Sequence, residues 1–344
     1  MPRQFKALLQ QLPSPMATQN PVGMPLIQNG SPAARGQQPA ADQRPPQRTP
    51  AQPPLEANLI GTNGADNLTG DASNNAYSAG SGDDLLMAST ANDSISGGSG
   101  YDILDYSRVN ADLNLARGGV LTKSGDLGTD TITGFDIEEI RANARRVNTI
   151  DGSTGTTASL DVDLSKDSLT INNLPFVGTA QLVVKNFTDV KGSENADVIT
   201  GSNGANALNG AGGDDVLNGL GGSDLLTGGA GNDIFVIGRG DSLLNGFDRI
   251  TDFVIGSDRI DGLTAQSSVR QLAGVQSLGA RDIGQVLNNQ TFGANSAATF
   301  TLGTGSGSRT FLALNDNQNG FQANSDLIVE ITGFRGNLNN LAII

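Results

Sequence analysis

The sequence predicts an all-β chain whose very short strands coil into two rolls, and three observations support this prediction. Glycine and aspartate recur at fixed places in nine-residue blocks, five at 61–105 and five at 192–236. The eighth residue of every block is apolar, which gives each block one inward-facing side chain. Aromatic residues make up only 4% of the chain and Trp is absent, so a large aromatic core is not expected.

Each block combines a turn with a short strand. The first six residues, as in GGAGND at 228–233, suit a turn because glycine adopts backbone conformations that other residues avoid. The last three, IFV at 234–236, suit a strand with one side chain inward. Two blocks then complete one coil of a parallel β-roll, and equivalent turns stack about 4.8 Å apart along it.

Position six of every block is Asp or Asn, so these side chains stack at an interval of two blocks. In chain order they are Asp66, Asn75, Asp84, Asp93, Asp102, Asp197, Asn206, Asp215, Asp224 and Asp233. Stacked carboxylates repel one another unless a cation lies between them. Ca²⁺ suits such a site because it takes about six to eight oxygens in irregular geometry, whereas Mg²⁺ requires a stricter octahedron. The alternative is a glycine-rich solenoid whose Asp residues only cap turns.

The predicted calcium ligands are the eight Asp residues at position six, together with glycines at positions one and four. These glycines are Gly64, Gly82, Gly97, Gly100, Gly210, Gly213, Gly222, Gly228 and Gly231. On one side of each roll, position six is always Asp, while the opposite side includes Asn75 or Asn206. We expect the all-Asp sides to bind Ca²⁺ more tightly. The best sites should then be Asp84/Asp102 and Asp215/Asp233, and the poorest should be Asn75/Asp93.

The repeated pattern GGxGxDxUx, where U is a large apolar residue, resembles the calcium-binding nonapeptide of RTX (repeats-in-toxin) proteins. GGAGNDIFV at 228–236 and GGSGYDILD at 97–105 match it nearly position for position. The resemblance implies a parallel β-roll, calcium-dependent folding, and export by type I machinery that reads an uncleaved C-terminal signal. SDLIVEITGFRGNLNNLAII at 325–344 also resembles the C-terminal domain of cyanobacterial surface proteins of this kind.

Composition divides the chain into five parts. Residues 1–58, rich in Pro and Gln, are expected to be a disordered tail. The first roll spans 59–105, an intervening segment with strand-like alternation spans 106–191, and the second roll spans 192–236. A mainly β domain at 237–344, with one or two short helices within 265–291, should carry the export signal.

Several classes of protein are disfavoured by what the chain lacks. Without Cys or His it can form no thiolate site, no Ser-His-Asp triad and no HExxH zinc site. A net charge of −14 disfavours nucleic acid and favours cations as partners. No apolar stretch is long enough for a transmembrane span, and nothing before Pro13 has the form of a signal peptide.

These features predict a secreted calcium-binding protein of the cell surface or extracellular matrix that is not an enzyme. One alternative is an adhesin that binds a surface, an envelope or a cell-surface polysaccharide. A less favoured alternative is a polysaccharide-modifying enzyme that works without His. The acidic cluster Asp136, Glu138 and Glu139 is expected to be a solvated charged face rather than a catalytic pair. The EF-hand-like spacing in NDNQNGFQANSD at 315–326 is expected to be a polar turn.

Overall fold

A computed structural model describes residues 57–344, except 135, 155–156 and 176. The described residues belong to one compact unit. The expected disordered tail therefore lies outside the described residues, apart from Ala57 and Asn58. These two residues begin the first strand, because they pair in parallel with Asn75 and Ala76 one coil further along.

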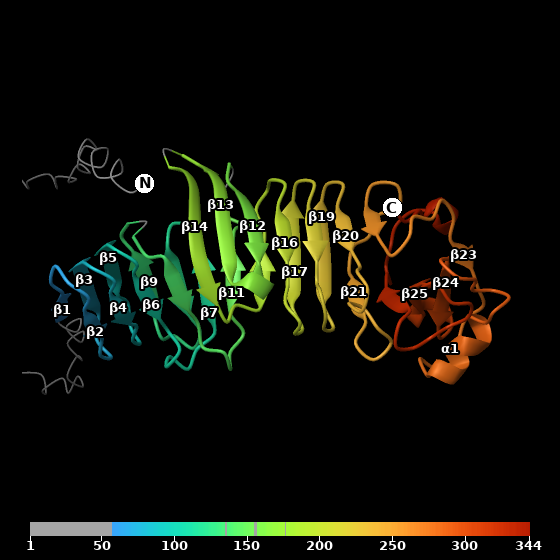
Figure 1. The fold of residues 1–344 in the computed structure, drawn as a ribbon, viewed down its shortest axis with the longest axis horizontal. Coiled ribbons are helices and arrows are strands. Elements are labelled where there is room, and N and C mark those ends of the chain that lie inside the picture. Colours follow the sequence, from blue (N-terminus) through green and yellow to red (C-terminus); the bar gives the residue numbers. More distant parts are fainter. Residues whose placement is uncertain (1–56, 135, 155–156, 176) are drawn as a thin grey trace, which may run out of the picture. The chain divides into compact units, whose positions relative to one another are not determined.

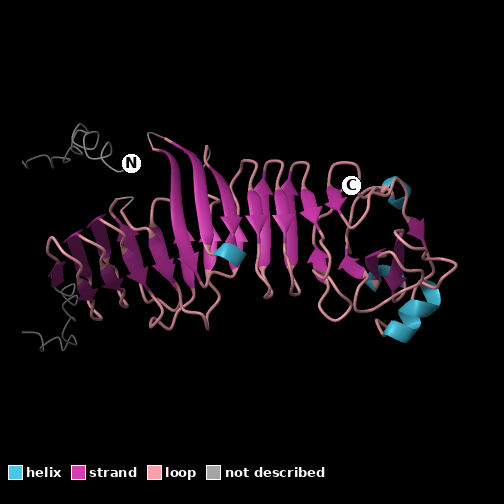
Figure 2. Cartoon of the chain, in the orientation of Figure 1, coloured by secondary structure: helices cyan, strands magenta, loops and turns pink. Residues whose placement is uncertain are grey.

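Two long sheets make up most of the described chain, and the expected all-β fold is confirmed (Figures 1 and 2). Sheet A has, in spatial order, β1 (Ala57–Ile60), β3 (Asn75–Ser81), β5 (Ser94–Ser99), β9 (Thr129–Ile132), β8 (Val120–Lys123), β7 (Leu113–Ala116), β11 (Thr149–Asp151), β15 (Asp189–Lys191), β17 (Ala207–Gly212), β19 (Leu225–Ala230), β21 (Asp248–Ile250), β26 (Leu327–Glu330), β25 (Arg309–Leu314), β24 (Ala297–Leu302) and β23 (Arg270–Gln271). Sheet B has β2 (Asn67–Thr69), β4 (Leu85–Met87), β6 (Ile103–Asp105), β10 (Glu139–Arg141), β14 (Gly178–Lys185), β13 (Ser168–Leu174), β12 (Ser159–Asp163), β16 (Val198–Thr200), β18 (Val216–Asn218), β20 (Ile234–Val236) and β22 (Arg259–Asp261).

Within each array, successive blocks alternate between the two sheets, and parallel partners are two blocks apart. Leu86 pairs with Leu104 in sheet B, and Tyr77 pairs with Ile95 in sheet A. In the second array Leu217 pairs with Phe235 in the same way. Because the eighth residues stack in this register, they form a thin continuous core between the sheets, and nearly all of them are buried.

The intervening segment continues both sheets rather than interrupting them. In sheet A, the antiparallel strands β7, β8 and β9 lie between β5 of the first array and β11. In sheet B, the antiparallel strands β12, β13 and β14 lie between β10 and β16 of the second array. Figure 1 shows the long strands β12, β13 and β14 in the middle of the stack. The two arrays are therefore parts of one continuous pair of sheets.

After the second array, the C-terminal region continues sheet A. Strand β21 pairs in parallel with β26, and β26, β25 and β24 form an antiparallel meander. The helix α1 (Ala280–Val286) covers a second apolar cluster through Ile283. Short 3-10 turns occur at Leu164–Lys166, Gly305–Gly307 and Leu338–Asn340. In the described part of the chain, no helix has both the length and the apolar character of a membrane span.

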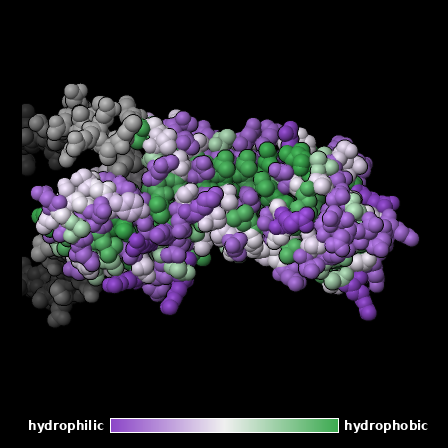
Figure 3. Space-filling model, viewed as in Figure 1, coloured by the Kyte–Doolittle hydropathy of each residue, from purple (hydrophilic) through white to green (hydrophobic). Residues whose placement is uncertain are grey.

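The outer face of sheet B carries an apolar row. Val198, Val216 and Ile234 occupy the seventh position of three blocks and are register partners. Val198 is 46% exposed. Apolar residues are visible over the central part of the stack in Figure 3.

Candidate calcium sites

The position-six side chains form two hydrogen-bonded ladders along each array. The backbone N–H of Asp84 donates to Asp102 Oδ1 (3.0 Å), and that of Asp215 donates to Asp233 Oδ1 (3.0 Å). On the other side of the second array, the N–H of Asn206 donates to Asp224 Oδ1 (2.8 Å). One oxygen of each carboxylate therefore ties two coils together, and the expected stacking at an interval of 18 is present.

The second carboxylate oxygen divides the turns into two classes. In the closed turns, position two is Ser or Thr and caps the residue at position six. Thr62 donates both its N–H (2.6 Å) and its hydroxyl (2.9 Å) to Asp66 Oδ2, and the Ser193 N–H donates to Asp197 Oδ2 (2.6 Å). Ser89 caps Asp93 through its hydroxyl (3.0 Å). These turns satisfy their own carboxylates.

In the open turns, position two is Gly, Ala or Leu and offers no hydroxyl. In each of them the Asp Oδ2 is buried and has no hydrogen-bond partner among the described residues. The five residues concerned are Asp84, Asp102, Asp215, Asp224 and Asp233. A buried polar atom without a hydrogen-bond partner destabilises the folded state by about 1–3 kcal/mol, and by more when it is charged. A bound cation or a proton on each of these oxygens would remove that penalty.

Burial raises the pKa of most of the open-turn carboxyls. The pKa of Asp215 rises to about 7, and those of Asp102, Asp224 and Asp233 rise to about 6. Neighbouring carboxylates add to the effect of burial, with Asp197 and Asp233 acting on Asp215. The sites thus favour either protonation or a bound cation over free negative charge.

The predicted glycines at position four and at position one are required for different reasons. Position-four glycines of open turns, such as Gly231 with φ +147°, adopt a backbone conformation that side chains disfavour. At position one the reason is space. A Cβ on Gly210 would lie 2.6 Å from the Gly228 carbonyl oxygen and would overlap Asp215 Oδ2. These two oxygens converge on one small space lined by acceptors, the arrangement that suits Ca²⁺.

The predicted site residues are thus brought together as pairs of neighbouring turns. Asp84/Asp102 and Asp215/Asp233 each join two open turns, whereas Asp66, Asp93 and Asp197 belong to closed turns, and Gly64 lies in the closed turn of Asp66. No three acidic side chains converge on one point in the described part of the chain. A Ca²⁺ ion between two such turns would be held by one or two carboxylates together with backbone carbonyls.

Where position six is Asn, the side-chain amide donates hydrogen bonds to backbone carbonyl oxygens of the turn. Asn75 Nδ2 donates to the carbonyl oxygens of Ser73 (2.6 Å) and Asp71 (3.3 Å) in its turn. Asn148, which precedes β11, accepts the Leu113 N–H (3.1 Å) and donates to three carbonyls, those of Asn143, Arg146 and Asn186. Amide hydrogens thus bond several carbonyl oxygens of these turns, while Asn75 Oδ1 is buried without a hydrogen-bond partner among the described residues.

The ladder that contains Asn75 and Asp93 ends next to Lys123, whose ammonium group is a cation supplied by the chain itself. The ladder continues from Asp93, whose N–H donates to Asp130 Oδ1 (2.8 Å), and Lys123 Nζ forms a salt bridge with the same carboxylate. The Tyr106 hydroxyl donates to Asp130 Oδ2 (2.6 Å). The side chains of Lys123 and Asp130 are both fully buried. The sequence carries no signal for this cluster, because its members follow no repeat.

The acidic residues 136–139 are not the solvated face that was expected. Glu139 is buried and is paired with Arg141 and Lys185. Glu138 instead extends the carboxylate ladder, because its Oε2 accepts the Asp102 N–H (2.8 Å). The correction arises because strand β10 pairs directly with β6, which places this segment against the last coil of the first array.

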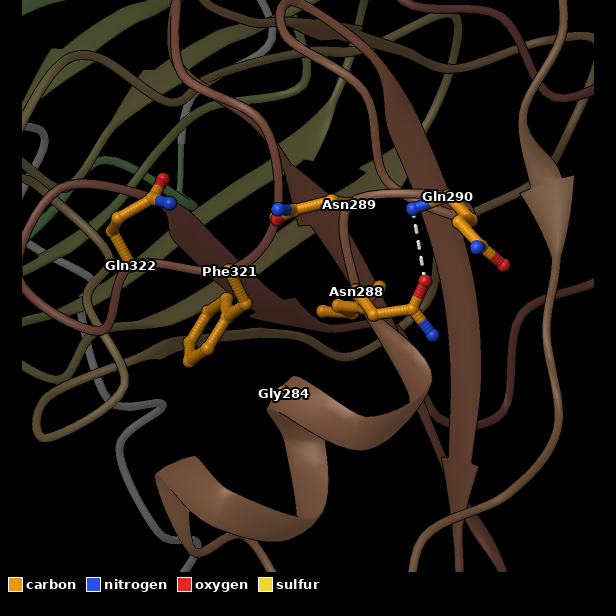
Figure 4. Close-up of a pocket in the computed structure, with 8 residues that line it drawn as sticks. Gly284, Asn288, Asn289, Gln290, Phe321 and Gln322 are labelled. Atoms are coloured by element: carbon orange, nitrogen blue, oxygen red, sulfur yellow. Dashed lines mark hydrogen bonds between the residues drawn. The ribbon is translucent and has the colours of Figure 1, made fainter.

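The EF-hand-like segment is a hydrogen-bonded polar turn, as expected. Asp326 accepts the backbone N–H groups of Asp316 (3.0 Å) and Gln322 (2.7 Å), so both of its oxygens are occupied. Next to this turn is an open pocket of about 580 Å³ (Figure 4). Its lining is rich in amides, with Asn288, Asn289, Gln290 and Gln322, and includes the ring of Phe321.

Residues 165–342, more than half of the chain, match the family described as Peptidase M10 serralysin C terminal. The chain belongs to this family. Residues 58–86 and 78–110 match the RTX calcium-binding nonapeptide repeat, so the resemblance to RTX proteins is confirmed. The serralysin C-terminal match covers the second array, and together the two matches indicate a secreted protein with calcium-binding repeats and type I secretion. The resemblance of residues 325–344 to cyanobacterial surface proteins stays a prediction.

Comparison with whole proteins adds little to the family assignment. No curated protein matches the chain. An extracellular lipase from Serratia marcescens is similar over 83% of this chain and 39% of the lipase chain, with 18% identity and a TM-score of 0.23. The chain thus spans well under half of that lipase, and nothing about function follows from a likeness of this size.

Proposed function

We propose that this serralysin C-terminal family protein is a non-enzymatic structural component of the cell surface or extracellular matrix whose sheets fold when Ca²⁺ binds. The observation that carries the proposal is the set of five open turns, each with a buried carboxylate oxygen that has no hydrogen-bond partner among the described residues. Several Ca²⁺ ions, each held between neighbouring turns by Asp and by backbone carbonyls, would satisfy these oxygens.

Coupling between binding and folding follows from the same carboxylates. Without Ca²⁺, their mutual repulsion and burial oppose folding, so the chain should stay unfolded where free Ca²⁺ is scarce. Outside the cell, Ca²⁺ would saturate sites with dissociation constants of about 10⁻⁴ to 10⁻³ M. Binding free energy then becomes folding free energy. The chain would stay unfolded while it passes through the export machinery and would fold outside the cell.

Circular dichroism of the full chain with Ca²⁺ and with an excess of chelator tests this proposal. The expected result is a β spectrum in Ca²⁺ and a largely unfolded spectrum after chelation, reversed when Ca²⁺ is restored. A β spectrum that does not change on chelation would overturn calcium-dependent folding. In that case the Asp residues would act as turn caps alone.

An adhesive role is a second candidate, and the amide-rich pocket favours it. Amides with one aromatic ring can hydrogen-bond and stack on a sugar, and Gln322 Oε1 is buried without a hydrogen-bond partner within the described part of the chain. Binding of polysaccharide fragments to the full chain, compared with a Phe321→Ala variant, tests this role. Binding that does not depend on Phe321 would exclude the pocket.

The enzymatic alternative has a direct test of its own. A polysaccharide-modifying activity without His would have to use Asp, Arg and Tyr side chains. Turnover of alginate and pectin by the calcium-loaded full chain should be undetectable if the protein is structural. Measurable turnover would replace the structural proposal with a catalytic one.

A further inference from the structure

The first array ends against a segment that belongs to no nonapeptide. After the last block, 97–105, the neighbouring coil in sheet B is β10, which is preceded by residues 133–138. Two bonds tie this segment to the last open turn, since Asp136 Oδ2 accepts the Gly98 N–H (3.0 Å) and the Ser96 hydroxyl (2.8 Å). The described residues of this segment, 133–134 and 136–138, thus take the place of the next turn.

This junction reproduces the oxygen pair of the regular turns. A Cβ on Gly97 would lie 2.6 Å from Asp102 Oδ2 and would overlap the carbonyl oxygen of Asp136. At Gly210 the same two positions are taken by Asp215 Oδ2 and the Gly228 carbonyl oxygen. Asp136 therefore occupies the place of the position-one residue in the following turn.

Asp136 also brings a carboxylate to a position that is Gly in the regular turn. Its Oδ1 is buried and has no hydrogen-bond partner in the part of the chain that the structure describes, and the same holds for Oδ2 of Asp102, which is 0% exposed. The junction thus brings Asp102 Oδ2 and the Asp136 carbonyl oxygen to one place, and Asp136 adds a carboxylate with an unpartnered oxygen.

The nearby basic side chains do not neutralise this junction. Arg141 and Lys185 form their salt bridges with Glu139. The opposite side of the same array is different, because there the chain supplies Lys123 to Asp130. The two sides of the first array thus end differently. The ladder through Asp93 ends at the ammonium group of Lys123, whereas the ladder through Asp102 ends at carboxylates with no cation from the described part of the chain.

We propose that Asp102 Oδ2 with the carbonyl and carboxylate oxygens of Asp136 hold a Ca²⁺ ion at this junction, outside the nonapeptide pattern. The inference rests on the proposed calcium-binding function. It adds that the non-repetitive segment before β10 binds an ion at the end of the first array. The row of calcium sites on the Asp84/Asp102 side then extends beyond the last nonapeptide. Oxygen ligands of mixed type and irregular placement suit Ca²⁺ best.

Counting bound Ca²⁺ by equilibrium dialysis of the full chain tests the inference. The Asp136→Asn variant retains an acceptor for Gly98 and Ser96 but loses the charge, so it should bind one ion fewer or bind it at least about tenfold more weakly. Asp126→Asn, which removes the same charge from an exposed turn, is the matched control and should bind like the wild type. Equal binding by Asp136→Asn and the wild type would overturn the inference.

A second measurement covers the case in which Asp136→Asn does not fold. Crystals of the wild-type protein grown with Tb³⁺ should show an anomalous peak between Asp102 Oδ2 and the Asp136 carbonyl oxygen. Peaks at Asp215/Asp233 with none at the junction would overturn the inference and leave the proposed function intact. A wild-type chain that binds no ion would instead overturn the proposed function.

Discussion

Replacing Lys123 with Met should destabilise the first array in a way that added Ca²⁺ does not repair. Lys123 is the buried counter-ion of Asp130, at the position where the ladder from Asp93 ends. Met keeps the length of the side chain and removes the charge. Asp130 then keeps the Tyr106 hydroxyl (2.6 Å) and the Asp93 N–H (2.8 Å) but has lost its cation.

The size of the effect follows from the burial of both partners. With both side chains fully buried, removing one should cost about 3–5 kcal/mol, because an uncompensated charge remains. That is a large part of the roughly 5–15 kcal/mol that stabilises a typical domain. The double variant Lys123→Met/Asp130→Asn should recover about half of the loss or more, since it removes the stranded charge as well.

Urea unfolding in excess Ca²⁺, followed by tyrosine fluorescence, measures this effect. All three tyrosines lie at positions 77, 101 and 106, so the signal reports on the first array and its immediate border. A wild-type midpoint for Lys123→Met would refute the role of the ammonium group. A low midpoint that rises to the wild-type value with more Ca²⁺ would also refute it, because Asp130 would then be accepting a metal ion.

The remaining predictions concern the metal sites themselves. Gly210→Ala should abolish one Ca²⁺ site, since its Cβ would overlap Asp215 Oδ2, whereas Gly204→Ala, whose Cβ would meet only Ser202 Oγ at 3.7 Å, should bind normally by calorimetry. Asp215→Asn should weaken Ca²⁺ binding more than Asp224→Asn, because Asp215 stacks between Asp197 and Asp233 whereas Asp224 stacks between Asn206 and Asp248, with one carboxylate neighbour instead of two; equal losses in a Ca²⁺ titration would show that the two sides do not differ. The chelated protein should lose residual stability as pH rises from about 4 to 8, because burial raises the pKa of Asp102, Asp224 and Asp233 to about 6, that of Asp215 to about 7 and that of Asp248 to about 8, from 3.8. The folded form then holds protons that the unfolded form has released, a contribution complete below pH 3.8 and lost by about pH 8. The β signal of the chelated chain in circular dichroism at several pH values would check this, and a β signal that grows as the pH rises would contradict it.

The periodic parts of the fold could be predicted because each rule acts locally. A turn of six residues and a strand of three fix which side chain points inward, so the eighth residues had to form the core. The same period fixed the stacking of Asp84 over Asp102 and of Asp215 over Asp233. Carboxylates stacked at that spacing repel one another, which is why the sequence predicts a cation between them.

The sequence also distinguishes the open turns from the closed turns. Position two is Thr62 or Ser193 in closed turns and Gly98 or Gly229 in open ones. A hydroxyl at that position reaches the carboxylate four residues later in the same turn. This signal could have separated turns that cap themselves from turns that leave an oxygen without a partner.

The sequence by itself determined the repeating coil, the thin core and the calcium-binding repeat pattern, because each of these depends on residues at a fixed short distance along the chain. Only the tertiary structure decided how the coils end. Lys123 reaches Asp130 through the antiparallel pairing of β8 with β9, and Asp136 reaches Asp102 through the pairing of β10 with β6. Such contacts join residues with no common period, so the packing of neighbouring coils decides which carboxylate receives an ammonium group and which does not.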